Sequence, residues 1–135
     1  MKKIDNFCSC LDILATADFS IAAHDDIYRM GVIGQFNLTF ELAWKSLKAV
    51  LEADGVGGAE TGSARDILKL AAATGFLNDD NVWLLMLKKR NLSIHIYNEE
   101  EVDELIVLIR DSFIPAFRVL ETLLVKKEKE IETDA

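Results

Sequence analysis

Residues 36–51 have the sequence FNLTFELAWKSLKAVL, in which apolar side chains recur at the spacing of an α-helix. The apolar stripe runs for about four turns and consists of Phe36, Phe40, Ala43, Trp44, Leu47, Val50 and Leu51. Polar side chains lie opposite it, and Glu41 precedes Lys45 by one turn, a pair worth about 0.3 kcal/mol. The pattern predicts a long amphipathic helix over residues 24–54, which ends where Gly55 favours a left-handed cap.

The rest of the chain also shows helical periodicity, and no segment is typical of a strand. We expect further helices over residues 3–17, from an N-cap at Ser63 to about Ala73, from Asn78-Asp79-Asp80 to about Tyr97, and over 99–129. Pro115 should kink the last one, because proline cannot donate the helical hydrogen bond to the Asp111 carbonyl. Residues 55–62 are a glycine-rich loop, and a turn is expected at Asp18 and Ser20. We therefore predict a single all-α domain over residues 1–135, an antiparallel up-and-down four-helix bundle with one additional short helix.

Composition limits the classes of function. The chain has 135 residues and a net charge of −8, which disfavours general nucleic-acid binding and leaves Lys88-Lys89-Arg90 as the densest local cationic site. Cys8 and Cys10 would point about 200° apart on a helix, so they are unsuited to share a disulfide or a metal. No signal peptide and no apolar run of membrane-spanning length is found, so we expect a cytoplasmic protein with no membrane association.

The helix expected to reach Tyr97 carries two apolar faces. One face holds Trp83, Met86, Leu87, Ile94 and Tyr97, and the other holds Val82, Leu85, Leu92 and Ile96. A helix with two apolar faces needs two partners. Its own bundle supplies one, and we predict that Val82, Leu85, Leu92 and Ile96 contact a second copy or another chain.

The same helix carries polar residues that can do chemistry. Arg90 lies within the first apolar face, where it could pair with a carboxylate of another helix or bind a phosphate. His95 could cap the helix end or move a proton, and Asn91 shares its face. Arg90 and His95 are about 140° apart on an ideal helix, so they meet only if the helix end distorts or two copies pack together. His24-Asp25-Asp26 has no metal-ligand spacing, and we expect no metal or cofactor.

Two motifs in this order resemble a known family. Arg90-x4-His95-x-Tyr97 resembles the Arg-x4-His-x-Tyr signature of HepT-like proteins of the HEPN superfamily, which are also described as nucleotidyltransferase substrate-binding proteins. The segment FELAWKSLK over residues 40–48 is similar to the core helix of that family. Arg65-Asp66 and the Trp83…Met86-Leu87 segment also fit in order. The resemblance covers residues 4 to 125, and the combination of both motifs is far more specific than the Arg-x4-His spacing alone.

This resemblance implies a small helical protein that forms a homodimer and is encoded beside a minimal nucleotidyltransferase. In the toxin–antitoxin branch it implies a metal-independent ribonuclease, with Arg90 and His95 catalytic at the dimer cleft, RNA as substrate and Asn91 in a supporting role. Tyr97 would be the residue to which the nucleotidyltransferase adds AMP. The alternative is a non-catalytic substrate-binding subunit of a two-chain nucleotidyltransferase, so whether the chain is an enzyme stays open.

Overall fold

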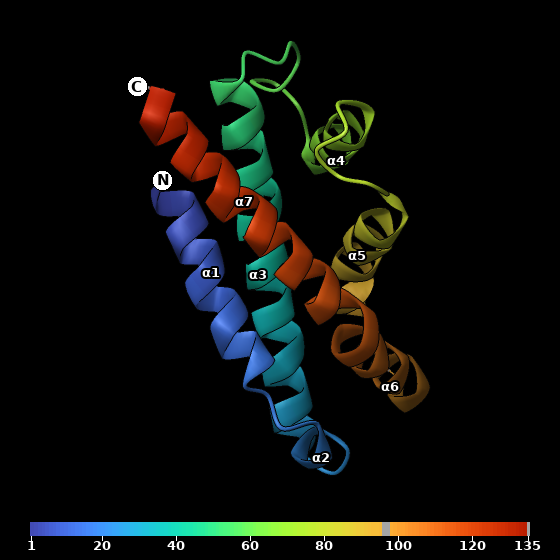
Figure 1. Ribbon diagram of the computed structural model, residues 1–135. Coiled ribbons are helices and arrows are strands. Elements are labelled where there is room, and N and C mark those ends of the chain that lie inside the picture. Colours follow the sequence, from blue (N-terminus) through green and yellow to red (C-terminus); the bar gives the residue numbers. More distant parts are fainter. Residues whose placement is uncertain (96–97, 135) are drawn as a thin grey trace.

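The computed structural model describes residues 1–95 and 98–134, which form helices joined by turns and loops, with no strand among them (Figure 1). The α-helices are Lys2–Ala15 (α1), Phe19–Ala22 (α2), Asp26–Ala53 (α3), Ala64–Ala73 (α4), Asn81–Leu92 (α5), Glu99–Leu108 (α6) and Ile114–Asp134 (α7). A 3₁₀ turn, Ser93–His95, follows α5, and a π-helical segment, Ile109–Phe113, joins α6 to α7. The predicted all-α class is confirmed.

Local sequence signals fix most helix ends. Asp25 caps α3 by accepting a hydrogen bond from the Tyr28 amide at 2.9 Å. Gly55, with φ of 71°, follows the end of α3 as expected. Ser63 and Asp66 form the reciprocal capping box that starts α4. The ends at Gly55 and Ser63 confirm the sequence prediction, because each depends only on residues within one turn of the helix end. The start of α3 was expected at residue 24 and lies at Asp26.

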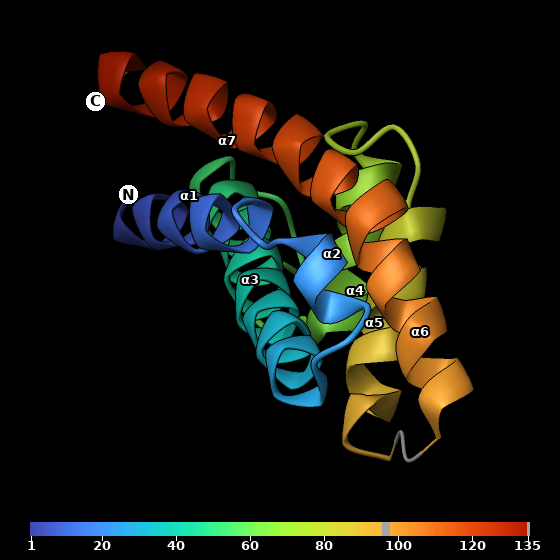
Figure 2. The same ribbon diagram turned by 90° about the horizontal axis from the view of Figure 1, so that it is seen from below.

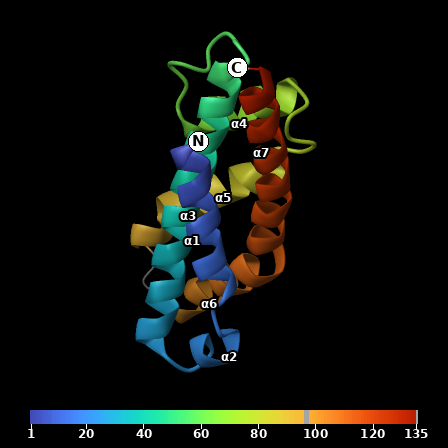
Figure 3. The ribbon, with the colours of Figure 1, turned by 60° about the vertical axis from the view of Figure 1, so that its left-hand side comes forward.

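The long helices α1, α3 and α7 lie alongside one another, and α1 runs antiparallel to α3 (Figures 1 and 3). Both termini lie at one end of the molecule, where the Met1 amino group donates to Glu128, a hydrogen bond that raises the pKa of that amino group. The expected turn at Asp18 is instead the N-cap of the short helix α2. Since α4 and α5 are separate and differently inclined, the up-and-down four-helix arrangement stays a prediction.

An aromatic cluster forms the centre of the core. The rings of Phe36 and Phe113 stack with centroids 5.2 Å apart, and Trp83 meets Phe117 edge-on at 5.5 Å. Phe40 packs 6.4 Å from both Phe36 and Trp83. Because these rings come from α3, α5, α7 and the π segment, the cluster ties α5 to the long helices.

The helix expected over residues 99–129 is interrupted close to Pro115, as the sequence predicted. The π segment Ile109–Phe113 lies immediately before Pro115, and the chain bends between α6 and α7 (Figure 2). Proline removes one backbone donor, and sharp bends in helices occur at prolines and at π bulges. The predicted kink is therefore confirmed as a change of helix type.

The prediction for α5 was wrong at its C-terminal end. The helix was expected to reach about Tyr97, but it ends at Leu92 and is followed by the 3₁₀ turn. Ile94 is 74% exposed, so the apolar period that suggested a longer helix has no packing surface within this chain. Tertiary packing, more than periodicity, sustains a helix.

The cysteines are both free, and none of the described helices is long and apolar enough to cross a membrane. Cys8 is half-buried against the core, and this burial, with the nearby Glu121 carboxylate, raises the pKa of its thiol to about 11. Cys8 is therefore a packing residue rather than a reactive thiol.

Candidate functional site

Arg90 is held against α3. It follows the buried residues Trp83 and Met86 on the inward face of α5, and its guanidinium carbon lies 5.7 Å from the centroid of the Phe40 ring. Its Nη1 is 3.5 Å from Oε2 of Glu41, and the side chain is 32% exposed. The predicted pairing with a carboxylate of another helix is confirmed, and a cation–π contact orients the guanidinium as well.

Glu41 does not saturate this arginine. The same carboxylate accepts a hydrogen bond from Trp44 Nε1 at 3.1 Å and lies 3.3 Å from Lys45 Nζ. Arg90 Nε is buried and has no hydrogen-bond partner among the described residues. A guanidinium carries five N–H donors. Because the Arg90 side chain is partly exposed, its fixed guanidinium could donate hydrogen bonds to an anionic group such as a phosphate.

Ser93 and Asn37 fasten the end of α5 to α3. Ser93 Oγ donates to the Arg90 carbonyl at 2.8 Å, a local bond to the backbone of its own turn. It also accepts a hydrogen bond from Asn37 Nδ2 at 3.1 Å. The sequence showed Asn37 only as part of the polar side of its helix, because a contact between residues far apart in the chain leaves no local signal. This bond places the 3₁₀ turn beside Arg90.

His95 occupies the outer end of that turn. It is exposed, and no hydrogen bond or ion pair joins it to Arg90 within the described part of the chain. The distortion of the helix end that would let the two residues approach is present, since the last turn is 3₁₀. The predicted AMP acceptor Tyr97 and the predicted contact residue Ile96 lie outside the described residues.

Asn91 lies on another side of α5. It lines a hollow of about 610 Å³ together with Arg65, Lys88, Leu84, Leu85, Leu87 and Leu92. This hollow is separate from the contact of Arg90 with α3, so Asn91 and Arg90 are not brought together within one chain. Of the predicted contact residues, Val82 and Leu85 are half-buried and Leu92 is 44% exposed.

Ion pairs between helices frame the segment around His95. Lys89 Nζ donates to Glu104 Oε1 at 2.8 Å, a hydrogen bond that lowers the pKa of Glu104. Arg29, only 4% exposed, pairs with Asp103 and lies 3.7 Å from Glu99. Sequence reasoning missed Arg29, because its partners on α6 are some 70 residues away. Together these pairs tie the start of α6 to α3 and α5, and they thereby set both ends of the connection that carries His95.

The described residues contain no cluster of three or more His, Cys, Asp or Glu side chains able to hold a metal ion. The groups at the end of α5 that could take part in a reaction are therefore the fixed guanidinium of Arg90 and the exposed imidazole of His95. Such a pair can bind an anion and transfer a proton.

The protein thus belongs to the class of small all-helical proteins that carry an arginine and a histidine at the end of one helix. Comparison with known proteins identifies the family. The family model described as "Nucleotidyltransferase substrate binding protein like" matches residues 2–126, and the chain belongs to this family. It is also similar to a probable ribonuclease HepT from Haemophilus influenzae, with 30% identity over 95 residues. The aligned region covers 69% of this chain and 65% of the relative's length. The predicted HepT-like relationship is confirmed.

Proposed function

We propose that this protein is the HepT-like component of a two-component, toxin–antitoxin system in the cytoplasm, with a nucleotidyltransferase as its partner. The proposed activity is metal-independent cleavage of RNA by Arg90 and His95. The observation that carries it is the fixed and partly exposed guanidinium of Arg90, beside a turn that ends in an exposed histidine. The name of the similar protein, a probable ribonuclease, supports this assignment.

The chemistry follows from the two side chains. The ribose 2′-oxygen attacks the phosphorus while the bond from phosphorus to the 5′-oxygen breaks. His95 takes the 2′-proton or supplies the proton that the leaving oxygen needs. Arg90 donates hydrogen bonds to the phosphate oxygens, where negative charge accumulates in the transition state. The second proton transfer falls to water or to a group of a second copy.

Local charge supports contact with a short RNA segment. The whole chain is acidic, but Lys88, Lys89 and Arg90 are consecutive, and Arg65 lies across the hollow from Lys88. Contact with a few phosphates does not require a basic protein overall, because screening confines the attraction to about 10 Å. We therefore expect recognition of a limited single-stranded site rather than general RNA binding.

The two histidines of the chain allow a matched test. Cleavage of RNA is measured in the presence of EDTA for the wild type, His95→Ala and His24→Ala. His24 is exposed in the turn that precedes α3, and it lies 66 positions before Arg90 in the sequence. The wild type and His24→Ala should cleave alike, and His95→Ala should be slower by about 100-fold or more. Equal rates for the two alanine variants, or no cleavage by the wild type, would refute the ribonuclease assignment.

The alternative is a non-catalytic subunit that presents a substrate, or its own Tyr97, to the nucleotidyltransferase. The acidic surface favours it, since a protein partner with a basic face would bind well. The two tyrosines again give a matched pair. Incubation with the transferase and ATP, followed by intact mass, should show one AMP added to the wild type and to Tyr28→Phe, and none to Tyr97→Phe. Addition to Tyr97→Phe would remove Tyr97 as the acceptor.

A further inference from the structure

Arg29 is the one charged side chain that is buried among the described residues. Its Nη2 pairs with Asp103 of α6. Its Nη1 lies 3.7 Å from Oε1 of Glu99, at the start of α6, and 3.6 Å from Oδ1 of Asp26. The Nε atom of Arg29 is buried as well and has no hydrogen-bond partner in the described part of the chain. Burial of a guanidinium is unfavourable, and a donor without a partner makes it more so.

The carboxylates that pair with Arg29 stay in contact with water, since their side chains are between 58% and 94% exposed. Ion pairs with exposed partners contribute little to the free energy of unfolding. Apolar side chains can often replace a buried ion pair without loss of stability. What an arginine adds is directional hydrogen bonding, which defines where its partner lies. The effect of Arg29 is therefore expected in the position of α6 more than in the stability of the fold.

The start of α6 is close in sequence to the residue proposed to transfer a proton. His95 ends the 3₁₀ turn, and Glu99 begins α6 four positions later. At the other end of this connection, Ser93 accepts a hydrogen bond from Asn37 of α3. Arg29 and Asn37 therefore attach both ends of the connection to a single helix.

The geometry of α3 sets the distances between its attachments. Arg29 and Asn37 are about 12 Å apart along the helix axis and about 80° apart around it. Glu41, which pairs with Arg90, lies about 6 Å beyond Asn37. In this order α3 holds the start of α6, the turn that ends in His95, and the Arg90 guanidinium. Loss of the first attachment would leave the connection held at one end by α3 instead of at both.

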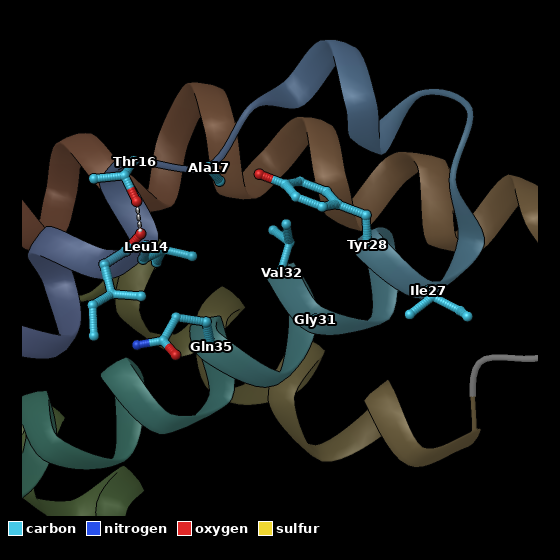
Figure 4. Close-up of a pocket in the computed structure, with 9 residues that line it drawn as sticks. Leu14, Thr16, Ala17, Ile27, Tyr28, Gly31, Val32 and Gln35 are labelled. Carbon is cyan, nitrogen blue, oxygen red and sulfur yellow. Dashed lines mark hydrogen bonds between the residues drawn. The ribbon is translucent and has the colours of Figure 1, made fainter.

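The N-terminal half of α3 is itself held on the side of α1. Tyr28 and Gln35 line a hollow of about 430 Å³ between α3 and the end of α1 (Figure 4). Gln35 Nε2 donates to the Cys10 carbonyl at 3.1 Å, and the Tyr28 hydroxyl accepts a hydrogen bond from the Asp18 amide at 2.7 Å. Arg29, the next residue, lies about 100° from Tyr28 around the helix. It therefore reaches α6 from a turn that is fixed on its other side.

We propose that Arg29 is a positioning residue. By holding Asp103 and Glu99 it fixes the start of α6, and it thereby fixes His95 relative to Arg90. The consequence for catalysis rests on the proposed function, in which a misplacement of about 1 Å can slow the reaction about 100-fold. Because Arg29 is buried, it would not contact RNA itself. It should therefore affect the rate of cleavage and not the binding of RNA.

The first test compares Arg29→Met with the wild type in RNA cleavage. The rate at saturating RNA should fall about tenfold or more, whereas the half-saturating RNA concentration should change by less than about twofold. The melting temperature should change little, because α6 still buries Val102, Leu105 and Ile106. Arg29→Lys keeps the charge and should recover part of the rate. A full rate in Arg29→Met would overturn the positioning role.

Asp103→Asn tests whether Arg29 acts through α6. This substitution changes an exposed side chain, keeps its shape and removes its charge. It should slow cleavage as well, and the double variant should be no slower than Arg29→Met alone, because both substitutions remove the same pair. Independent effects that multiply in the double variant would overturn the route through α6.

Two control variants separate position from stability. Arg118→Met removes another arginine that pairs with carboxylates, Asp12 and Glu121, and it should cleave like the wild type. Leu11→Ala truncates a buried residue of α1, which packs on α3 and α7. It should lower the melting temperature and leave the rate of the folded protein unchanged. Equal losses of rate in Leu11→Ala and Arg29→Met would mean that global stability explains the effect, which would overturn the proposal.

Hydrogen exchange separates this inference from the proposed function. The amides of residues 93–95 and 99–103 should exchange about fivefold faster or more in Arg29→Met, and Arg118→Met should leave them unchanged. Unchanged exchange in Arg29→Met would overturn the placement of His95 by Arg29, whether or not RNA is cleaved. A wild type without cleavage, together with faster exchange in Arg29→Met, would refute the proposed function and leave the placement of His95 standing.

Discussion

The two ends of the Arg90–His95 segment differ in how the fold holds them. Arg90 is fixed by the Phe40 ring and the Glu41 carboxylate of α3, in contact with the core. Five residues later, His95 ends a 3₁₀ turn on the surface, next to the exposed Ile94. The difference indicates that a single chain fixes Arg90 but leaves His95 on the surface. Under the proposed function, the group that binds the phosphate is therefore positioned within one chain, whereas the position of the group that transfers the proton depends on contacts made with a second copy or a substrate.

The largest expected effect lies on the Arg90 side. Phe40→Ala would remove a fully buried ring that packs against Phe36, Trp83 and the Arg90 guanidinium. We expect a loss of about 3–5 kcal/mol in the free energy of unfolding, measured by urea denaturation. Ile94→Ala, a matched deletion on the exposed side, should change it by less than about 0.5 kcal/mol. Similar losses for both variants would mean that the two ends are equally embedded in the fold.

The next comparison separates stability from activity at the two residues themselves. Arg90→Met keeps much of the side-chain stem and loses the cation–π and ion-pair contacts, which together should cost about 1 kcal/mol, since both groups are partly exposed. His95→Ala should change stability by less than about 0.5 kcal/mol. Under the proposed function both variants lose cleavage. An active Arg90→Met would show that the fixed guanidinium has a structural role only.

The sequence predicted those features of the fold that depend on local signals. The capping box at Ser63, the end of α3 at Gly55 and the break before Pro115 each follow from residues within one turn, and all three are confirmed. The partner class of Arg90, a carboxylate on another helix, was also predicted. Glu41 could not be identified as that carboxylate, because the packing of α5 on α3 depends on the whole core.

The errors have a common physical origin. Periodicity extended α5 to Tyr97, yet the helix ends at Leu92, and Ile94 finds no packing surface within the described part of the chain. Arg29 was overlooked because its carboxylates come from α6, which the chain reaches only after the whole of α4 and α5. Both cases show that helical patterns identify faces but do not identify what covers them.

A smaller effect on stability is expected at Ser93, which lies between Arg90 and His95 and is bonded to Asn37 of α3. Asn37→Ala would remove the hydrogen bond to Ser93 Oγ, and such a bond contributes about 1 kcal/mol. The amides of residues 93–95 should then exchange hydrogen about fivefold faster. Global stability should fall less, because the substitution also removes the buried Oδ1 of Asn37, which has no partner among the described residues. Asn91→Ala, on the exposed side of α5, is the control, and equal acceleration in both variants would contradict the tie to α3.

The smallest effect concerns the pH dependence of the contact between α5 and α6. The hydrogen bond from Lys89, with the charge of that residue, lowers the pKa of Glu104 below its ordinary value of 4.5. A lowered pKa means that this pair stabilises the fold above the ordinary pKa and stops doing so as the pH falls through the lowered value. An NMR titration of the Glu104 carboxyl should therefore show a midpoint below 4.5 that rises toward the ordinary value in Lys89→Met. Lys88→Met should shift it less, because Lys88 acts on Glu104 only through its charge. A midpoint that Lys89→Met leaves unchanged would mean that α6 is not held to α5 beside His95 by this pair.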